Sequence, residues 1–73
     1  MKKFSNNTHK IKAILSVFGG GEKLEGDEIA NRLKEKGYLV NKGNIRMFIY
    51  YNMLYKYLQK ELRDGKNYYS LIN

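Results

Sequence analysis

The chain has 73 residues, with 14 Lys and Arg against 7 Asp and Glu, which gives a formal charge of +7. It contains no Cys, Pro or Trp and one His, His9. A single domain of this size buries roughly 60% of the surface of its unfolded chain, which leaves little volume for an enclosed substrate cavity. Without Cys, and with one His, neither a disulfide framework nor a typical zinc site can form. We therefore expect no metal, no cofactor and no enzymatic activity.

The start of the chain does not resemble a secretion signal. Met1, Lys2 and Lys3 are followed by Phe4 and a polar run instead of a long apolar segment. The most apolar stretch, residues 47–55, is less than half of the roughly 20 residues that span a bilayer. We expect an intracellular, cytoplasmic protein that does not cross a membrane, with residues 1–7 as a flexible basic tail. The abundance of Lys, Asn, Tyr and Ile is typical of genomes rich in A and T, such as viral or archaeal ones.

Positive charge is concentrated at the two ends of the chain. Residues 1–12 contain four lysines and no acid, and residues 41–73 contain six bases against two acids. Residues 13–40 contain four bases against five acids. Charge divided in this way favours a surface that faces a polyanion, above all nucleic acid. A solvated basic face and an anionic membrane surface are the alternatives.

Two helices are predicted in the first half of the chain. The first is capped by Thr8 and ended by the glycines at 19–21, and its apolar stripe consists of Ile11, Ile14, Leu15 and Phe18. Residues 23–25 are too few for more than a short strand or bridge. Asp27 can then cap a second helix, which Gly37 ends and whose inward residues are Ile29, Ala30 and Leu33.

A third helix and a hairpin are predicted in the second half. Residues 38–40 (Tyr-Leu-Val) can plug the core, and Asn41 caps the helix, which ends between 52 and 56 and buries Ile45, Phe48, Ile49 and Met53. From residue 57 the period changes to two around an Asp-Gly turn at 64–65, which indicates a hairpin. A two-residue turn pairs Leu62 with Asn67, Lys60 with Tyr69 and Leu58 with Leu71, whereas a three-residue turn would break this pairing. The core side then holds Leu58, Leu62, Tyr69 and Leu71, and Arg63 faces Lys66, a repulsion that an external anion would relieve.

Three segments resemble parts of winged helix-turn-helix transcription regulators. Gly-Asp-Glu-Ile-Ala-Asn-Arg-Leu (26–33), Gly-Tyr-Leu-Val-Asn-Lys-Gly-Asn-Ile-Arg (37–46) and Arg-Asp-Gly-Lys-Asn-Tyr-Tyr (63–69) are similar to the second helix, the start of the recognition helix and the wing. The resemblance covers residues 8–72 and implies one α+β, mostly helical domain. It also implies a homodimer that binds double-stranded DNA, with the recognition helix, 41–53, in the major groove and the wing, 57–72, on flanking backbone or minor groove.

The chain departs from this pattern at two positions. Asn52 lies where such helices bury an aliphatic residue, and it can either take a left-handed backbone conformation at the helix end or face a dimer partner. Lys56 lies where a Gly commonly separates the helix from the wing.

The residues expected to contact DNA follow from the buried stripe of the third helix. Arg46 can bind guanine, Asn44 adenine and Met47 a thymine methyl group, and Lys42 can hold a phosphate at the helix start. The full set is Lys10, Lys12, Lys42, Asn44, Arg46, Met47, Tyr50, Tyr51, Arg63, Lys66 and Asn67. The acids of the second helix are expected on a face away from DNA: Asp27, Glu28 and Glu35.

Two other functions remain open. A winged-helix interaction module would bind protein through its tyrosines, because Tyr50, Tyr51, Tyr55 and Tyr57 suit a core rim or a dimer interface better than base stacking. A nonspecific nucleic-acid or chromatin binder would differ from a regulator only in its specificity ratio.

Overall fold

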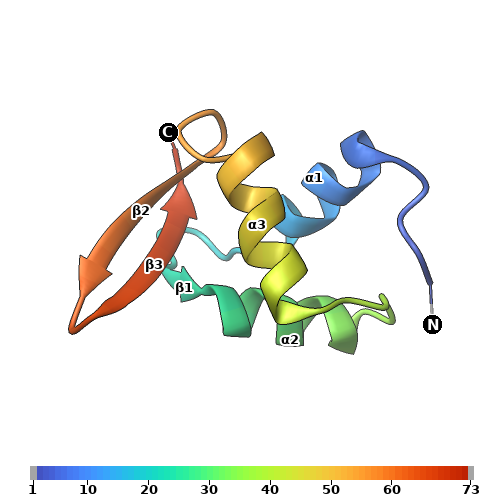
Figure 1. Cartoon of the computed structure of the whole chain (residues 1–73), viewed down its shortest axis with the longest axis horizontal. Helices are drawn as coiled ribbons and strands as arrows, with labels where there is room; N and C mark the ends of the chain where they lie inside the picture. Colours follow the sequence, from blue (N-terminus) through green and yellow to red (C-terminus); the bar gives the residue numbers. More distant parts are fainter. Residues whose placement is uncertain (1, 73) are drawn as a thin grey trace.

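Three helices and a three-stranded antiparallel sheet make up residues 2–72, the part of the chain that the computed structural model describes (Figure 1). The helices are α1 (Asn7–Ser16), α2 (Gly26–Glu35) and α3 (Lys42–Asn52). The strands are β1 (Leu24–Glu25), β2 (Leu58–Arg63) and β3 (Lys66–Leu71), in the order β1-β3-β2. The structure thus confirms an α+β class with more residues in helices than in strands.

Helix α1 begins before Thr8. The backbone N–H of His9 donates to the Asn6 side-chain oxygen at 2.8 Å, so Asn6 is the N-cap and the prediction of Thr8 is wrong. Asn and Thr side chains can both accept this bond, so the neighbouring sequence does not decide between them. Phe18 lies beyond the end of the helix but is buried.

An ion pair joins the end of α1, the glycine loop and α2. The two terminal nitrogens of Arg32 donate to the two carboxylate oxygens of Glu22, each at 2.7 Å. Arg32 also donates to the Val17 carbonyl at 2.8 Å, and the Gly19 N–H donates to Glu22 at 2.7 Å. The bonds that the Glu22 carboxylate accepts, first those from Arg32 and then that from Gly19, lower the pKa of Glu22 to about 2.

Strand β1 continues directly into α2. Glu25 is the N-cap, and its backbone N–H donates to the Glu28 carboxylate at 3.2 Å. Asp27 lies inside the first turn, so its prediction as the cap is wrong, although a carboxylate there still favours the helix dipole. The predicted inward residues are fully buried, and Gly37 follows the helix with a φ of 94°.

Helix α3 begins as predicted. The Asn41 side chain accepts from the N–H groups of residues 43 and 44 at 2.9 and 3.2 Å. Ile45, Ile49 and Met53 are buried, whereas Phe48 is only partly buried. Asn52 is helical and donates to the Phe48 carbonyl at 3.2 Å, which excludes the left-handed conformation considered for it.

The connection from α3 to β2 turns at Tyr55. This residue has a φ of 65°, in the left-handed region that non-glycine residues rarely adopt. Its backbone N–H donates to the Leu58 carbonyl at 2.6 Å. The chain therefore turns at a tyrosine, one residue before Lys56, the position where the resemblance places a glycine.

The hairpin has the predicted register and turn. Leu58 pairs with Leu71, Lys60 with Tyr69, Leu62 with Asn67 and Arg63 with Lys66. Asp64 and Gly65 have φ values of 49° and 79°, as a tight two-residue hairpin turn requires. Leu62, however, is 70% exposed, because the hairpin tip extends beyond the helices (Figure 1). Its predicted place in the core is wrong.

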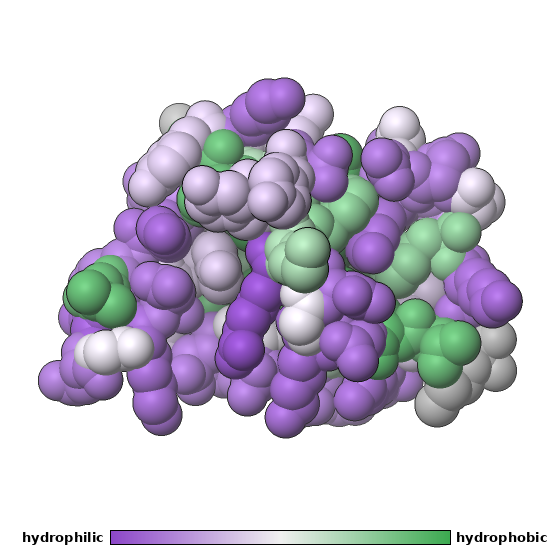
Figure 2. Space-filling view, in the orientation of Figure 1, coloured by the Kyte–Doolittle hydropathy of each residue, from purple (hydrophilic) through white to green (hydrophobic). Residues whose placement is uncertain are grey.

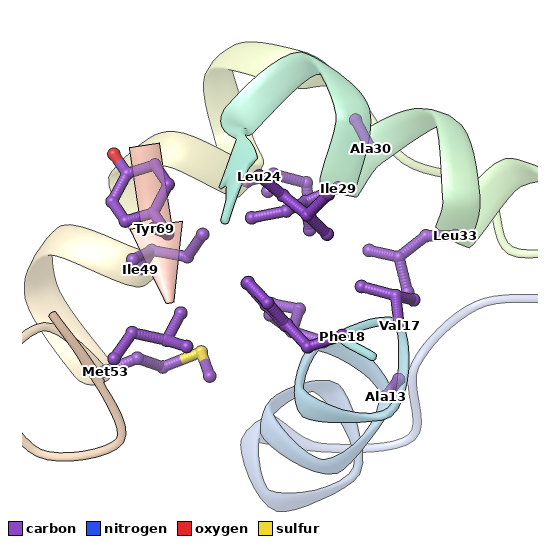
Figure 3. Packing of buried hydrophobic residues seen from close by; sticks show 13 residues of the cluster. Ala13, Val17, Phe18, Leu24, Ile29, Ala30, Leu33, Ile49, Met53 and Tyr69 are labelled. Carbon is purple, nitrogen blue, oxygen red and sulfur yellow. The ribbon is translucent and has the colours of Figure 1, made fainter. Parts of the chain in front are cut away.

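The core draws on all three helices and all three strands. Figure 3 shows Val17 beside Leu33 and Ile49 beside Met53, with the hydroxyl of Tyr69 pointing away from the cluster. The loop after α2 contributes in part, since residues 38 and 40 pack against the core and Leu39 is 54% exposed.

The first residues lie against the loop that follows α2. The backbone N–H of Lys2 donates to the Gly37 carbonyl at 2.7 Å, and the Lys2 carbonyl accepts from the Leu39 N–H at 2.8 Å. The ring of Phe4 stacks on that of Tyr38, with 4.6 Å between centroids. The prediction of a flexible tail over residues 1–7 is therefore wrong in part, because Lys2 and Phe4 are docked and Asn7 is the first residue of α1. Met1 lies outside the described residues.

Replacing Leu58 or Leu62 with Ala tests the extent of the core, since both leucines lie on one face of β2. Leu58 is 0% exposed, so we expect Leu58→Ala to lower the free energy of unfolding by about 2–5 kcal/mol. Leu62→Ala should change it by less than about 0.5 kcal/mol. Urea denaturation followed by circular dichroism measures both, and equal losses would contradict the boundary of the core.

Replacing Glu22 with Gln tests the ion pair. The pKa of Glu22 is lowered from 4.5 to about 2, so its stabilising contribution is present above pH 4.5 and is lost as the pH falls towards 2. We expect wild type to be more stable than Glu22→Gln near neutral pH, by a margin that shrinks over this range. Urea denaturation at several pH values checks this, with Glu35→Gln as a control, and a margin that does not change with pH would refute it.

Candidate nucleic-acid interface

The outer face of α3 presents the side chains expected there. Because Ile45 and Ile49 face the core, the opposite side of the helix is exposed, and this face is open to solvent beside the hairpin (Figure 1). The exposed residues are Lys42, Asn44, Arg46, Met47, Tyr50 and Tyr51.

A groove of about 280 Å³ lies between α3 and the hairpin. It is lined by Glu25, Gly26, Arg46, Gly65, Lys66, Asn67 and Tyr69. The structure therefore brings Arg46 together with two hairpin residues of the predicted set. Arg63 is exposed on the neighbouring strand and does not line this groove.

Four of the basic residues predicted to contact DNA lie beside acidic side chains of the protein itself. Arg46 donates to the Asp27 carboxylate, which also lies 3.6 Å from the ammonium of Lys42. Asp27 is therefore not on a separate acidic face, and that prediction is wrong. It is close because the start of α2 packs beside the start of α3.

In the β-hairpin, the basic side chains of Arg63 and Lys66 also lie beside carboxylates. Arg63 lies 2.9 Å from Glu61, and Lys66 lies 3.9 Å from Glu25. The predicted like-charge repulsion is thus relieved by carboxylates of the protein, without an external anion. The basic groups are more than half exposed, so solvent screens each pair and it contributes little to stability, and a phosphate can replace the carboxylate.

Lys10 of α1 lies at the edge of the α3 face. Its ammonium group is 4.5 Å from the ring centroid of Phe48, and partial burial lowers its pKa. A depression of about 600 Å³ beside it is lined by Lys3, Phe4, Asn6, Asn7, Lys10, Leu39, Val40, Asn41 and Asn44. Lys12 is exposed on the same helix but does not line this depression.

Sequence reasoning missed several residues of this surface. Gly26 and Asp27 were placed in the second helix, but nothing in their 19- to 20-residue separation from Arg46 indicated contact. Lys3 was placed in the tail and not in the site. The pair of Glu61 and Arg63 had a detectable signal, because residues two apart in a strand point to the same side.

Four exposed tyrosines surround the end of α3. Tyr50, Tyr51, Tyr55 and Tyr57 are 61%, 71%, 69% and 44% exposed, and we call this group the tyrosine patch. Figure 2 shows pale, moderately hydrophilic side chains over this part of the molecule. The rings of Tyr50 and Tyr51 pack edge to face, with 5.0 Å between their centroids. Such exposure does not fit a core rim within one chain.

Comparison with family models, with curated proteins and with solved structures gave no match. Among residues 2–72, no helix combines the length and apolarity needed to traverse a bilayer. The same residues contain no group of three or more His, Asp or Glu side chains placed to hold a metal ion.

Proposed function

We propose that the chain is a winged helix-turn-helix regulator that binds specific sequences of double-stranded DNA. Helix α3 lies in the major groove, and the hairpin acts as the wing on flanking backbone or minor groove. The observation that carries this proposal is the groove where Arg46 of α3 meets Lys66 and Asn67 of the hairpin.

The arrangement of the elements supports this fold. A short strand between the first two helices pairs with the second strand of a C-terminal hairpin, and the hairpin lies beside the third helix (Figure 1). An exposed helix of this kind fits the major groove, which is about 12 Å wide.

The chemistry of the exposed face supports base recognition. Arg46 offers paired N–H donors for guanine, and Asn44 offers a donor and an acceptor for adenine. Lys42 is positioned at the start of α3, where free backbone N–H groups also attract phosphate. Lys10 and Lys66 flank the helix on its two sides. Phosphates would replace the carboxylates that now pair with Lys42 and Lys66, with release of counterions from DNA.

Replacing Arg46 or Lys42 with Ala separates base reading from phosphate contact. A preferred duplex is first selected from random sequence, and fluorescence anisotropy then measures its affinity and that of a random duplex at about 50 and 200 mM salt. Arg46→Ala should reduce the preference by about 1–3 kcal/mol. Lys42→Ala should weaken binding to both duplexes equally and reduce the salt slope by about one.

Lys34→Ala is the matched control, because this exposed lysine lies in the last turn of α2. It should leave the preference unchanged. An unaltered preference in Arg46→Ala would remove α3 from recognition. If wild type binds neither duplex at low salt, the proposed function is wrong.

The tyrosine patch supports a second candidate function, association of two copies of the chain. Major-groove contacts come mainly from the first turns of a recognition helix, which leaves the patch at the other end free. Tyrosine is enriched at protein interfaces, where its ring is buried and its hydroxyl stays hydrated. The same surface would serve a protein-interaction module without DNA binding.

Replacing Tyr50, Tyr51 and Tyr55 with Ser tests this association. Sedimentation equilibrium should show wild type as a dimer and the triple variant as a monomer. Because these side chains are exposed, the fold should persist in circular dichroism spectra. Leu62→Ala removes an exposed apolar side chain of the hairpin tip and should leave the dimer intact. A monomeric wild type, or a dimeric triple variant, would contradict the role of the patch.

A further inference from the structure

The side chain of Arg46 occupies space that a glycine leaves open. A Cβ atom added to Gly26 would lie 2.8 Å from Cγ and 2.9 Å from Nε of Arg46, closer than real Cβ atoms come. Gly26 is a buried helical residue and does not need a positive φ. A larger residue at this position would therefore have to displace the Arg46 side chain.

The next residue holds the other end of the same side chain. A terminal nitrogen of Arg46 donates to the Asp27 carboxylate. The stem of Arg46 thus lies over Gly26, and its guanidinium group is bonded to Asp27. Tyr69 lines the same groove, so Arg46 lies between the start of α2 and the hairpin.

We propose that Gly26 and Asp27 are positioning residues that hold Arg46 for guanine recognition, an inference that rests on the proposed DNA binding. A guanidinium group has enough N–H donors to bond one carboxylate and still donate to O6 and N7 of guanine. An arginine already held in one conformation also loses less entropy on binding than a free one.

Positioning by Asp27 can be distinguished from simple repulsion of DNA. Its negative charge opposes every phosphate, so its removal should strengthen binding to any duplex at low salt. Loss of positioning should instead weaken discrimination at one G·C pair. Repulsion changes the affinity for every duplex, whereas positioning changes the ratio of affinities at one G·C pair.

The test compares wild type with Asp27→Asn and Gly26→Ala. Each binds the duplex selected by wild type and versions of it in which single G·C pairs are replaced. Wild type should discriminate about 10-fold or more at one pair, as a bidentate arginine contact does. Both variants should lose most of that discrimination. Asp27→Asn should also bind random duplex more tightly, whereas Gly26→Ala, which keeps the charge, should not.

Glu35→Gln is the control for charge, since it removes one exposed acid from the same helix. It should retain the discrimination of wild type. Thermal melting confirms that each variant is folded. In the DNA-free protein, the NMR signal of the Arg46 Nε–H should shift in both variants, while that of Arg32, held by Glu22, stays in place.

Three outcomes would overturn the inference. If Asp27→Asn strengthens binding to all duplexes by one factor, Asp27 only repels DNA. If both variants retain discrimination at every G·C pair, or if the Arg46 signal does not shift, Arg46 is not positioned by them. If wild type itself prefers no duplex, the proposed function fails together with the inference.

Discussion

The packing of the apolar stripe of α3 is the constraint on which the rest of the surface depends. Ile45 and Ile49 of α3, and Met53 directly after it, are at most 1% exposed, and burying each such side chain contributes roughly 1.5–3 kcal/mol. The helix cannot rotate about its axis without exposing them. Their burial therefore sets the outward direction of Arg46 and the other polar residues, and it does so in a chain that has no cysteine for a disulfide.

The proposed interface is positively charged, but several of its basic side chains form ion pairs with carboxylates of the protein. Basic side chains of α3 and of the hairpin tip lie beside carboxylates of α2, β1 and β2. Such exposed pairs are weak and screened by salt, so a polyanion can displace them. In the proposed complex with DNA, the carboxylates would repel nearby phosphates and lower the affinity for nonspecific sequences. Acidic side chains beside basic ones would then favour discrimination between sequences over tight binding to every duplex.

Much of the fold followed from local patterns. The buried stripe of α2, the Asn41 cap, the stop at Gly37 and the hairpin register are all properties of neighbouring residues, and all were predicted. The stripe of α3 was predicted except for Phe48, which is only partly buried. The caps at Thr8 and Asp27 were wrong because several residues near each helix start can accept the same hydrogen bond. Leu62 was misplaced because alternation identifies the face of a strand, but not how far the strand extends beyond the core.

The candidate site, like the fold, was predicted from the sequence only in part. The sequence by itself determined which side chains α3 exposes, because helical periodicity and a buried stripe leave only one outer face. Only the tertiary structure decided that Gly26 and Asp27 lie against Arg46, and that Lys3 and Lys10 share a depression with Asn44. Contacts between elements depend on distance in space after packing. No local spacing in the chain encodes that distance, so the carboxylates beside Lys42, Arg46 and Lys66 became known only from the folded chain.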